Sequence, residues 1–125
     1  MISEIAQVRP TKIEIKGEQV YYKTQKAMHF ENGKWTELKR EENAWIYELP
    51  LFHGYYLERH YKKLMQVIHN PKQLGEYCFD NQIKAKLFTV IESDKLSFPS
   101  ISLSNDFIQF LSCLRATLEP DIYII

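Results

Sequence analysis

The chain has 125 residues, of which 45% are hydrophobic and 14% aromatic, so it can build one packed domain and is not expected to be disordered. Its 16 basic residues balance 16 acidic ones, which argues against a general affinity for nucleic acid or for anionic membranes. We expect a single domain that spans residues 1–125.

The two cysteines, Cys78 and Cys113, stand in no C-x-x-C pair, so we expect two reduced, partly buried thiols and no disulfide framework. No apolar run reaches the roughly 18 residues of a membrane span. Residues 1–5 lack the basic and apolar regions of a signal peptide. The expected location is therefore the cytoplasm.

The sequence of the first half of the chain predicts strands. Residues 11–16 alternate polar and apolar side chains, which is the period of a half-buried strand, and residues 19–23 resume extended structure. Asn32-Gly33 tolerates the two positive φ angles of a type I′ turn and predicts a hairpin. Residues 44–49 are rich in aromatic and branched side chains and predict a further strand before Pro50.

The middle of the chain reads as helix followed by strand. Apolar residues recur on one side of a helical wheel between Leu57 and His69, which predicts an amphipathic helix. Asn70 and Pro71 predict the start of a second, short helix that runs through Tyr77. Residues 82–92 return to strand character, and the sequence Phe-Thr-Val-Ile within them predicts a strand that is buried on both faces.

The last part predicts a compact unit of strand, helix and strand. Residues 101–103 form its first strand, residues 105–118 carry a strongly periodic helix, and residues 119–125 form an apolar closing strand. The expected fold class is α+β, with a mostly antiparallel sheet and two main amphipathic helices on one of its faces. If the closing strand pairs parallel to residues 82–92 or to residues 101–103, the crossover should be right-handed.

Several short motifs resemble a bacterial family known as domain of unknown function 4279. They are Arg9-Pro10-Thr11, Lys16-Gly17-Glu18, Trp45 before an amphipathic helix, Pro99 to Ser104, Leu111 with Leu114, and Asp121-Ile122-Tyr123. The resemblance covers most of the chain. It implies a ferredoxin-like α+β fold without an established activity, in a class of proteins often found near secreted-toxin genes as candidate immunity proteins.

The N-terminal region departs from the family pattern. Such proteins carry a strand ahead of the segment that matches residues 3–11, and this chain starts too late to supply it. Either the true start lies upstream or the sheet has an edge of a different kind. An unfinished edge near residues 3–22 would expose unpaired backbone groups and invite a strand from another chain.

The sequence offers little catalytic chemistry. His60 and His69 are nine residues apart, which places them on opposite sides of a helix, while His53 lies before the helix begins, so we expect no metal. Cys113 shares its helix with no histidine that could act as its base. No phosphate-binding loop, nucleophile elbow or zinc-protease pattern occurs. We therefore expect neither an enzyme nor a cofactor.

Aromatic residues concentrate in the first half of the chain, and most of them are expected to pack in the core. On an open sheet face they could stack on the bases of a single-stranded nucleic acid, but residues 1–50 hold as many acidic as basic side chains. Exposed tyrosine and tryptophan more often mark a protein interface. The candidate anchors are Tyr21, Tyr22 and Trp35, and the candidate basic rim is Arg59, Lys62 and Lys63, although a solvated helix face also explains the latter.

The sequence as a whole favours a non-enzymatic protein-binding module, specifically an immunity-type protein that neutralises a bacterial toxin. Its partner would be another protein, or a second copy bound through an exposed sheet edge, and neither nucleic acid nor membrane is expected. The alternative is a sensor that binds a small ligand or nucleotide between helices and sheet. A weaker alternative is a hydrolase with His, Asp and Tyr groups gathered from separate strands.

Overall fold

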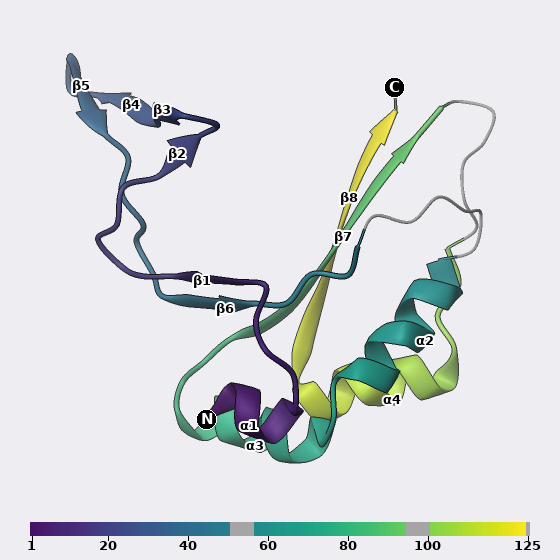
Figure 1. The fold of residues 1–125 in the computed structure, drawn as a ribbon. Coiled ribbons are helices and arrows are strands. Elements are labelled where there is room, and N and C mark those ends of the chain that lie inside the picture. Colours follow the sequence, from purple (N-terminus) through teal and green to yellow (C-terminus); the bar gives the residue numbers. More distant parts are fainter. Residues whose placement is uncertain (51–56, 95–100, 125) are drawn as a thin grey trace. The chain divides into compact units, whose positions relative to one another are not determined.

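The computed structural model describes residues 1–50, 57–94 and 101–124 (Figure 1). Within these ranges the chain has an α+β fold with four helices and eight strands, which confirms the predicted class. It divides into two compact units. We call residues 1–8 and 49–125 unit 1, and residues 9–48 unit 2.

Unit 1 holds all four helices and the two longest strands. Its elements are α1 (Ile2–Ala6), α2 (Leu57–Val67), α3 (Pro71–Asp80), β7 (Ala85–Ser93), α4 (Asn105–Leu114) and β8 (Ala116–Ile124).

The α2 and α3 helices begin where the sequence predicts, and α3 continues to Asp80. Pro71 occupies the first turn of α3 as expected. Asn70 does not cap the helix with its side chain. It adopts a left-handed backbone with φ of 51°, and its side-chain amide donates to the carbonyl oxygen of Ile5 at 2.9 Å. The residue therefore ties α1 to the start of α3.

The α4 helix is shorter than predicted. The Ser104 hydroxyl accepts a hydrogen bond from the Phe107 N–H at 3.2 Å and caps its N-terminus. The helix ends because Arg115 takes a left-handed backbone with φ of 53°, so that Leu118 belongs to β8 and not to the helix. Residues 101–103, which we expected to form a strand, are assigned to no strand.

The core of unit 1 centres on Phe107, whose side chain is only 1% exposed. Its ring stacks on Tyr61 with centroids 4.0 Å apart and lies 5.9 Å from Phe110. The Tyr61 hydroxyl and the Thr89 hydroxyl lie 3.0 Å apart and share a hydrogen bond. This contact links α2 to β7 through the same cluster.

The β7 and β8 strands pair in parallel along their full length, from Ala85 opposite Ala116 to Ser93 opposite Ile124. Our prediction that this region is buried on both faces is wrong. Exposed and less exposed residues alternate along β7, and Phe88 and Val90 are 58% and 62% exposed. An apolar run does not distinguish a strand that is covered on both faces from one that is covered on a single face.

Unit 2 consists of short antiparallel strand pairs. They are β1 (Lys12–Glu14) with β6 (Ala44–Ile46), β2 (Tyr21–Tyr22) with β3 (Gln25–Lys26), and β4 (Met28–Glu31) with β5 (Lys34–Glu37). Asn32 and Gly33 connect β4 to β5 with φ angles of 53° and 75°, which confirms the predicted hairpin.

The strands in the described ranges form four separate two-stranded sheets, so the expected single, mostly antiparallel sheet is not confirmed.

The expectation of an open strand edge from residue 3 onward is wrong for the first residues. Residues 2–6 form α1, and Ile5 and Ala6 are buried. Burial of these two apolar side chains against the rest of unit 1 stabilises a helix that is too short to form alone.

Candidate functional site

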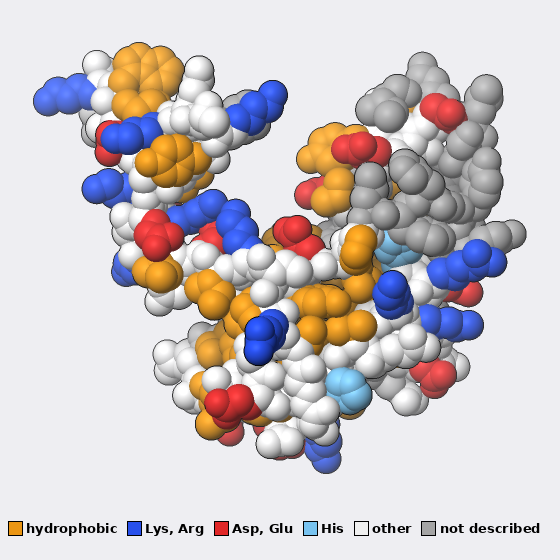
Figure 2. All heavy atoms as spheres, in the orientation of Figure 1, with side chains coloured by type: hydrophobic (Ala, Val, Ile, Leu, Met, Phe, Trp, Pro, Cys, Tyr) orange, Lys and Arg blue, Asp and Glu red, His pale blue; other side chains and the backbone are white. Residues whose placement is uncertain are grey.

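The clearest candidate surface is one face of the β4–β5 hairpin. Phe30 lies opposite Trp35 in the register, and the two rings meet at 5.3 Å with their planes inclined by 58°. Met28 points to the same face. The exposed fractions of Met28, Phe30 and Trp35 are 45%, 60% and 68%. We call these three side chains the aromatic hairpin face. Figure 2 shows apolar groups beside Lys and Arg side chains in the region of β4 and β5.

The opposite face of the hairpin is polar and makes its own hydrogen bonds. Thr36 and His29 contact each other at 3.1 Å, and His29 lies 3.3 Å from a carboxylate oxygen of Glu31. These groups satisfy one another, whereas the aromatic hairpin face leaves large apolar areas in water. The apolar side is therefore the one that gains most from a partner.

An ion pair borders the aromatic hairpin face. The Lys26 ammonium group lies 3.1 Å from a carboxylate oxygen of Glu37. This hydrogen bond, together with the negative charge of Glu37, raises the pKa of Lys26. Tyr21 lies opposite Lys26 in the β2–β3 pair and is 55% exposed. The surface thus combines exposed rings with a fixed charge pair at its border.

Three backbone segments of unit 2 meet at Gln19. Their hydrogen bonds close a ring in which the N–H groups of Val20, Leu38 and Ala27 donate to the carbonyls of Leu38, Ala27 and Val20 at 2.7–2.9 Å. The side-chain amide of Gln19 donates to the same three carbonyl oxygens at 2.9–3.1 Å. The amide NH2 group has two hydrogens, which these three oxygens share, so this side chain holds the base of the hairpin in place.

We expect Gln19→Glu to loosen this junction by about 2 kcal/mol, because it replaces the donor with a carboxylate that faces three carbonyl oxygens. The measurement is amide hydrogen exchange at Val20, Ala27 and Leu38. Gln25→Glu is the matched control, since Gln25 is exposed on the neighbouring β3 strand. Equal exchange in both variants would show that the Gln19 amide does not hold the junction.

The residues proposed from sequence fall on two surfaces. Tyr21 and Trp35 lie in unit 2 and are exposed, and the side chain of Tyr22 is outside what the structure describes. Met28 and Phe30 were missed. The Asn32-Gly33 turn could have revealed Phe30, because a two-residue turn fixes Phe30 opposite Trp35.

The predicted basic rim lies on one side of α2. Arg59, Lys62 and Lys63 are spaced three and four residues apart and are all exposed. Between them, partial burial and the charge of Lys63 lower the pKa of His60. Because this helix belongs to unit 1, we treat the basic rim and the aromatic hairpin face as separate surfaces.

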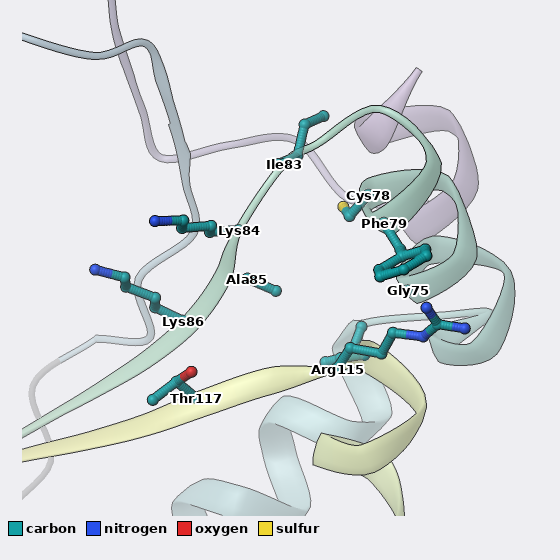
Figure 3. Close-up of a pocket in the computed structure, with 10 residues that line it drawn as sticks. Gly75, Cys78, Phe79, Ile83, Lys84, Ala85, Lys86, Arg115 and Thr117 are labelled. Atoms are coloured by element: carbon teal, nitrogen blue, oxygen red, sulfur yellow. The ribbon is translucent and has the colours of Figure 1, made fainter.

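A small pocket of about 220 Å³ lies within unit 1, between α3, the C-terminal end of α4 and the starts of β7 and β8 (Figure 3). The guanidinium carbon of Arg115 sits 4.1 Å from the centre of the Phe79 ring at its wall. Lys84 and Lys86 also line it, but Figure 3 shows their side chains extending to the other side of β7 from Phe79 and Arg115.

Buried Cys78 also lines this pocket, and burial raises the pKa of its thiol, which disfavours the nucleophilic thiolate. Cys113 is exposed and not partly buried as predicted, and both cysteines are free thiols. Across the described ranges, no three His, Cys, Asp or Glu side chains gather in a way that could hold a metal ion, and His53 lies outside these ranges.

Comparison with known proteins identifies the family. None of the helices in the described ranges has the length and apolar character to cross a membrane. No curated protein and no solved structure matches the chain. The family model described as domain of unknown function (DUF4279) matches residues 1–125, and the chain therefore belongs to this family.

Proposed function

We propose that this protein is a non-enzymatic protein-binding module and that the aromatic hairpin face is its contact surface. The observation that carries the proposal is that Trp35 is 68% exposed and contacts Phe30, which is itself 60% exposed. Tryptophan is the residue type most enriched among the anchors of protein interfaces, and a neighbouring ring adds to the area that a partner can bury.

The distribution of buried residues between the two units, as far as the structure describes them, supports the proposal. All nine buried hydrophobic residues of the described chain lie in unit 1. Short two-stranded hairpins are only marginally stable in water when no apolar face is covered. Unit 2 would therefore gain stability from a partner that covers Met28, Phe30 and Trp35.

The specific form of this proposal is an immunity-type protein of a bacterial cytoplasm that neutralises a toxin. The small size and the balance of 16 basic and 16 acidic residues suit a module that binds a protein and not a polyanion. Arg59, Lys62 and Lys63 would contact an acidic partner as a second surface. The proposal also retains the ferredoxin-like arrangement, which an experimental structure of the full chain would test.

We expect Trp35→Ala to weaken capture of the partner at least tenfold when the chain is co-expressed with the products of neighbouring genes, because it removes the largest exposed anchor. The measurement is co-purification followed by binding titration. Ile108→Ala is the matched control, since Ile108 is 48% exposed on α4 and lies in the other unit.

Two results would contradict the proposal. One is that no neighbouring gene product is captured and none is toxic without this chain. The other is that Trp35→Ala and Ile108→Ala bind the partner equally well. Circular dichroism of both variants separates loss of binding from loss of the fold.

The pocket favours a second candidate, a sensor for a small ligand. Arg115 supplies one cation and Phe79 one aromatic face, so the ligand would be small, with an apolar body and a single anionic group. A compound present at 100 times its dissociation constant should add about 2.7 kcal/mol of stability. Thermal-shift screening of small carboxylates and phosphates, repeated on Arg115→Gln, tests this. A hit that Arg115→Gln does not weaken would place the ligand elsewhere.

A further inference from the structure

Among the described residues of unit 1, nothing pairs with the outer edge of β7. The strand pairs with β8 on one side, and no other described strand pairs with it. A strand of nine residues with one free edge presents a row of unpaired N–H and C=O groups. The β7 strand contains no proline and no glycine, and is rich in branched and aromatic residues that favour strand pairing.

The outer edge of β8 is protected by Pro120. This residue lies opposite Thr89 in the register. Because proline has no N–H, its nitrogen cannot donate to β7 and must face the outer edge, where it interrupts any added ladder. Glu119 and Asp121 flank it with negative charges. The edge available for a further strand is therefore that of β7.

The position of Pro120 also fixes which groups of β7 face outward. Backbone groups of a parallel pair alternate along each strand, so if Thr89 points its N–H and C=O at β8, its neighbours point theirs away. The outward-facing backbone groups then belong to Lys86, Phe88, Val90 and Glu92. The side chains of these four residues also form the exposed face of the strand.

We propose that a second copy of this chain pairs with β7 along this edge, antiparallel and centred on Thr89. This register places Lys86 opposite Glu92 of the second copy, and by symmetry Glu92 opposite its Lys86. Phe88 meets Val90 in the same way, and all four residues have outward-facing backbone groups. The pairing therefore forms about eight backbone hydrogen bonds and joins two strand pairs into one sheet.

Charge and apolar character select this register over its neighbours. A shift by two residues in one direction places Glu92 opposite Phe88 and Lys86 opposite Asp94, just beyond the strand. A shift in the other places Lys86 opposite Val90 and Glu92 opposite Lys84, just before the strand. Each shifted register thus sets a charged side chain against an apolar one, whereas the register centred on Thr89 gives every one of the four residues a complementary partner. Lys86 already lies 3.7 Å from Glu119 of its own chain, and both side chains remain partly exposed, which leaves its ammonium group able to contact a second carboxylate. Opposite charges that face each other across strands stabilise the pair.

The expected dimer is weak. Edge-to-edge pairing of strands of this length buries less area than a standard protein interface, so we expect a dissociation constant of roughly 1–100 µM. The interface uses residues of unit 1 alone, and it does not depend on the function proposed for the aromatic hairpin face.

The experiment is analytical ultracentrifugation of the full chain from roughly 1 µM to roughly 1 mM. We expect Glu92→Lys to raise the dissociation constant about tenfold or more, because two lysines then face each other at both ends of the pairing. The double variant Lys86→Glu with Glu92→Lys should restore the dimer. Val90→Pro should abolish it while preserving β7–β8, because only an outward-facing N–H is lost.

Amide exchange identifies the edge directly. In the dimer, the amides of Lys86, Phe88, Val90 and Glu92 should be protected at high concentration and should exchange on dilution. A chain that is monomeric throughout the concentration range overturns the proposal, whether these amides exchange freely or are covered by another segment of the same chain. A dimer that tolerates both Glu92→Lys and Val90→Pro also overturns it.

Discussion

Replacement of Phe107 by alanine should lower the free energy of unfolding by about 3–5 kcal/mol, which is the largest effect that we expect from a single side chain. Phe107 is 1% exposed and contacts both Tyr61 and Phe110. Its removal leaves a cavity between α2 and α4, beside the Tyr61 ring whose hydroxyl shares a hydrogen bond with Thr89 of β7. Urea unfolding monitored by circular dichroism measures the change.

Two variants make this prediction specific. Ile108→Ala changes the next residue of α4, which is 48% exposed, and should alter stability by at most about 0.5 kcal/mol. Tyr61→Phe keeps the stacked rings but removes the hydrogen bond to Thr89, and should cost about 1 kcal/mol. If Phe107→Ala costs no more than Ile108→Ala, the core of unit 1 lies elsewhere.

Replacement of Gly75 by alanine should destabilise the protein by about 2–3 kcal/mol, although helix propensity alone predicts a gain of about 0.5–1 kcal/mol. Gly75 lies inside α3, where α4 approaches closely. A Cβ atom there would overlap the carbonyl oxygen of Cys113 and lie 2.9 Å from its carbonyl carbon and 3.0 Å from the Cα of Leu114. These are backbone atoms, so no side-chain rotation relieves the overlap.

Whether the unfolding midpoint of Gly75→Ala falls or rises tests the close approach of α3 and α4. Thermal unfolding of Gly75→Ala should show a midpoint about 5–10 °C below that of the parent chain. Glu76→Ala is the matched control, because Glu76 is the next residue of α3 and is exposed. A rise in the midpoint of Gly75→Ala would mean that the two helices do not approach as closely as described.

Local signals in the sequence predicted local structure well. Asn32-Gly33 identified its hairpin, because the turn requires positive φ angles that this pair tolerates. The wheel patterns located α2 and the start of α4, because an amphipathic face is a property of the segment itself. Pro71 located the start of α3, because proline favours the first turn of a helix. The family was also identified from short motifs, and the family match confirms it.

Features that depend on distant residues were not predictable. The α1 helix has five residues and is held by contacts to α3, so its own sequence gives no helical signal. The left-handed conformation of Arg115 ends α4 without a glycine or proline to announce it. The Gln19 side chain reaches carbonyls as far as 19 residues away in sequence, and nothing in an isolated glutamine indicates that it donates to three of them.

The hydrogen bond between α1 and the start of α3 has a consequence for the order in which the protein folds during synthesis. The amide of Asn70 contacts the carbonyl of Ile5 across 65 residues of sequence, and all of unit 2 is synthesised between them. At about 5–20 residues per second, α1 emerges from the ribosome several seconds before the helix that holds it. Ile5 and Ala6 are therefore first exposed to solvent or bound by a chaperone. Unit 1 can complete its fold only after the β8 strand has also been translated.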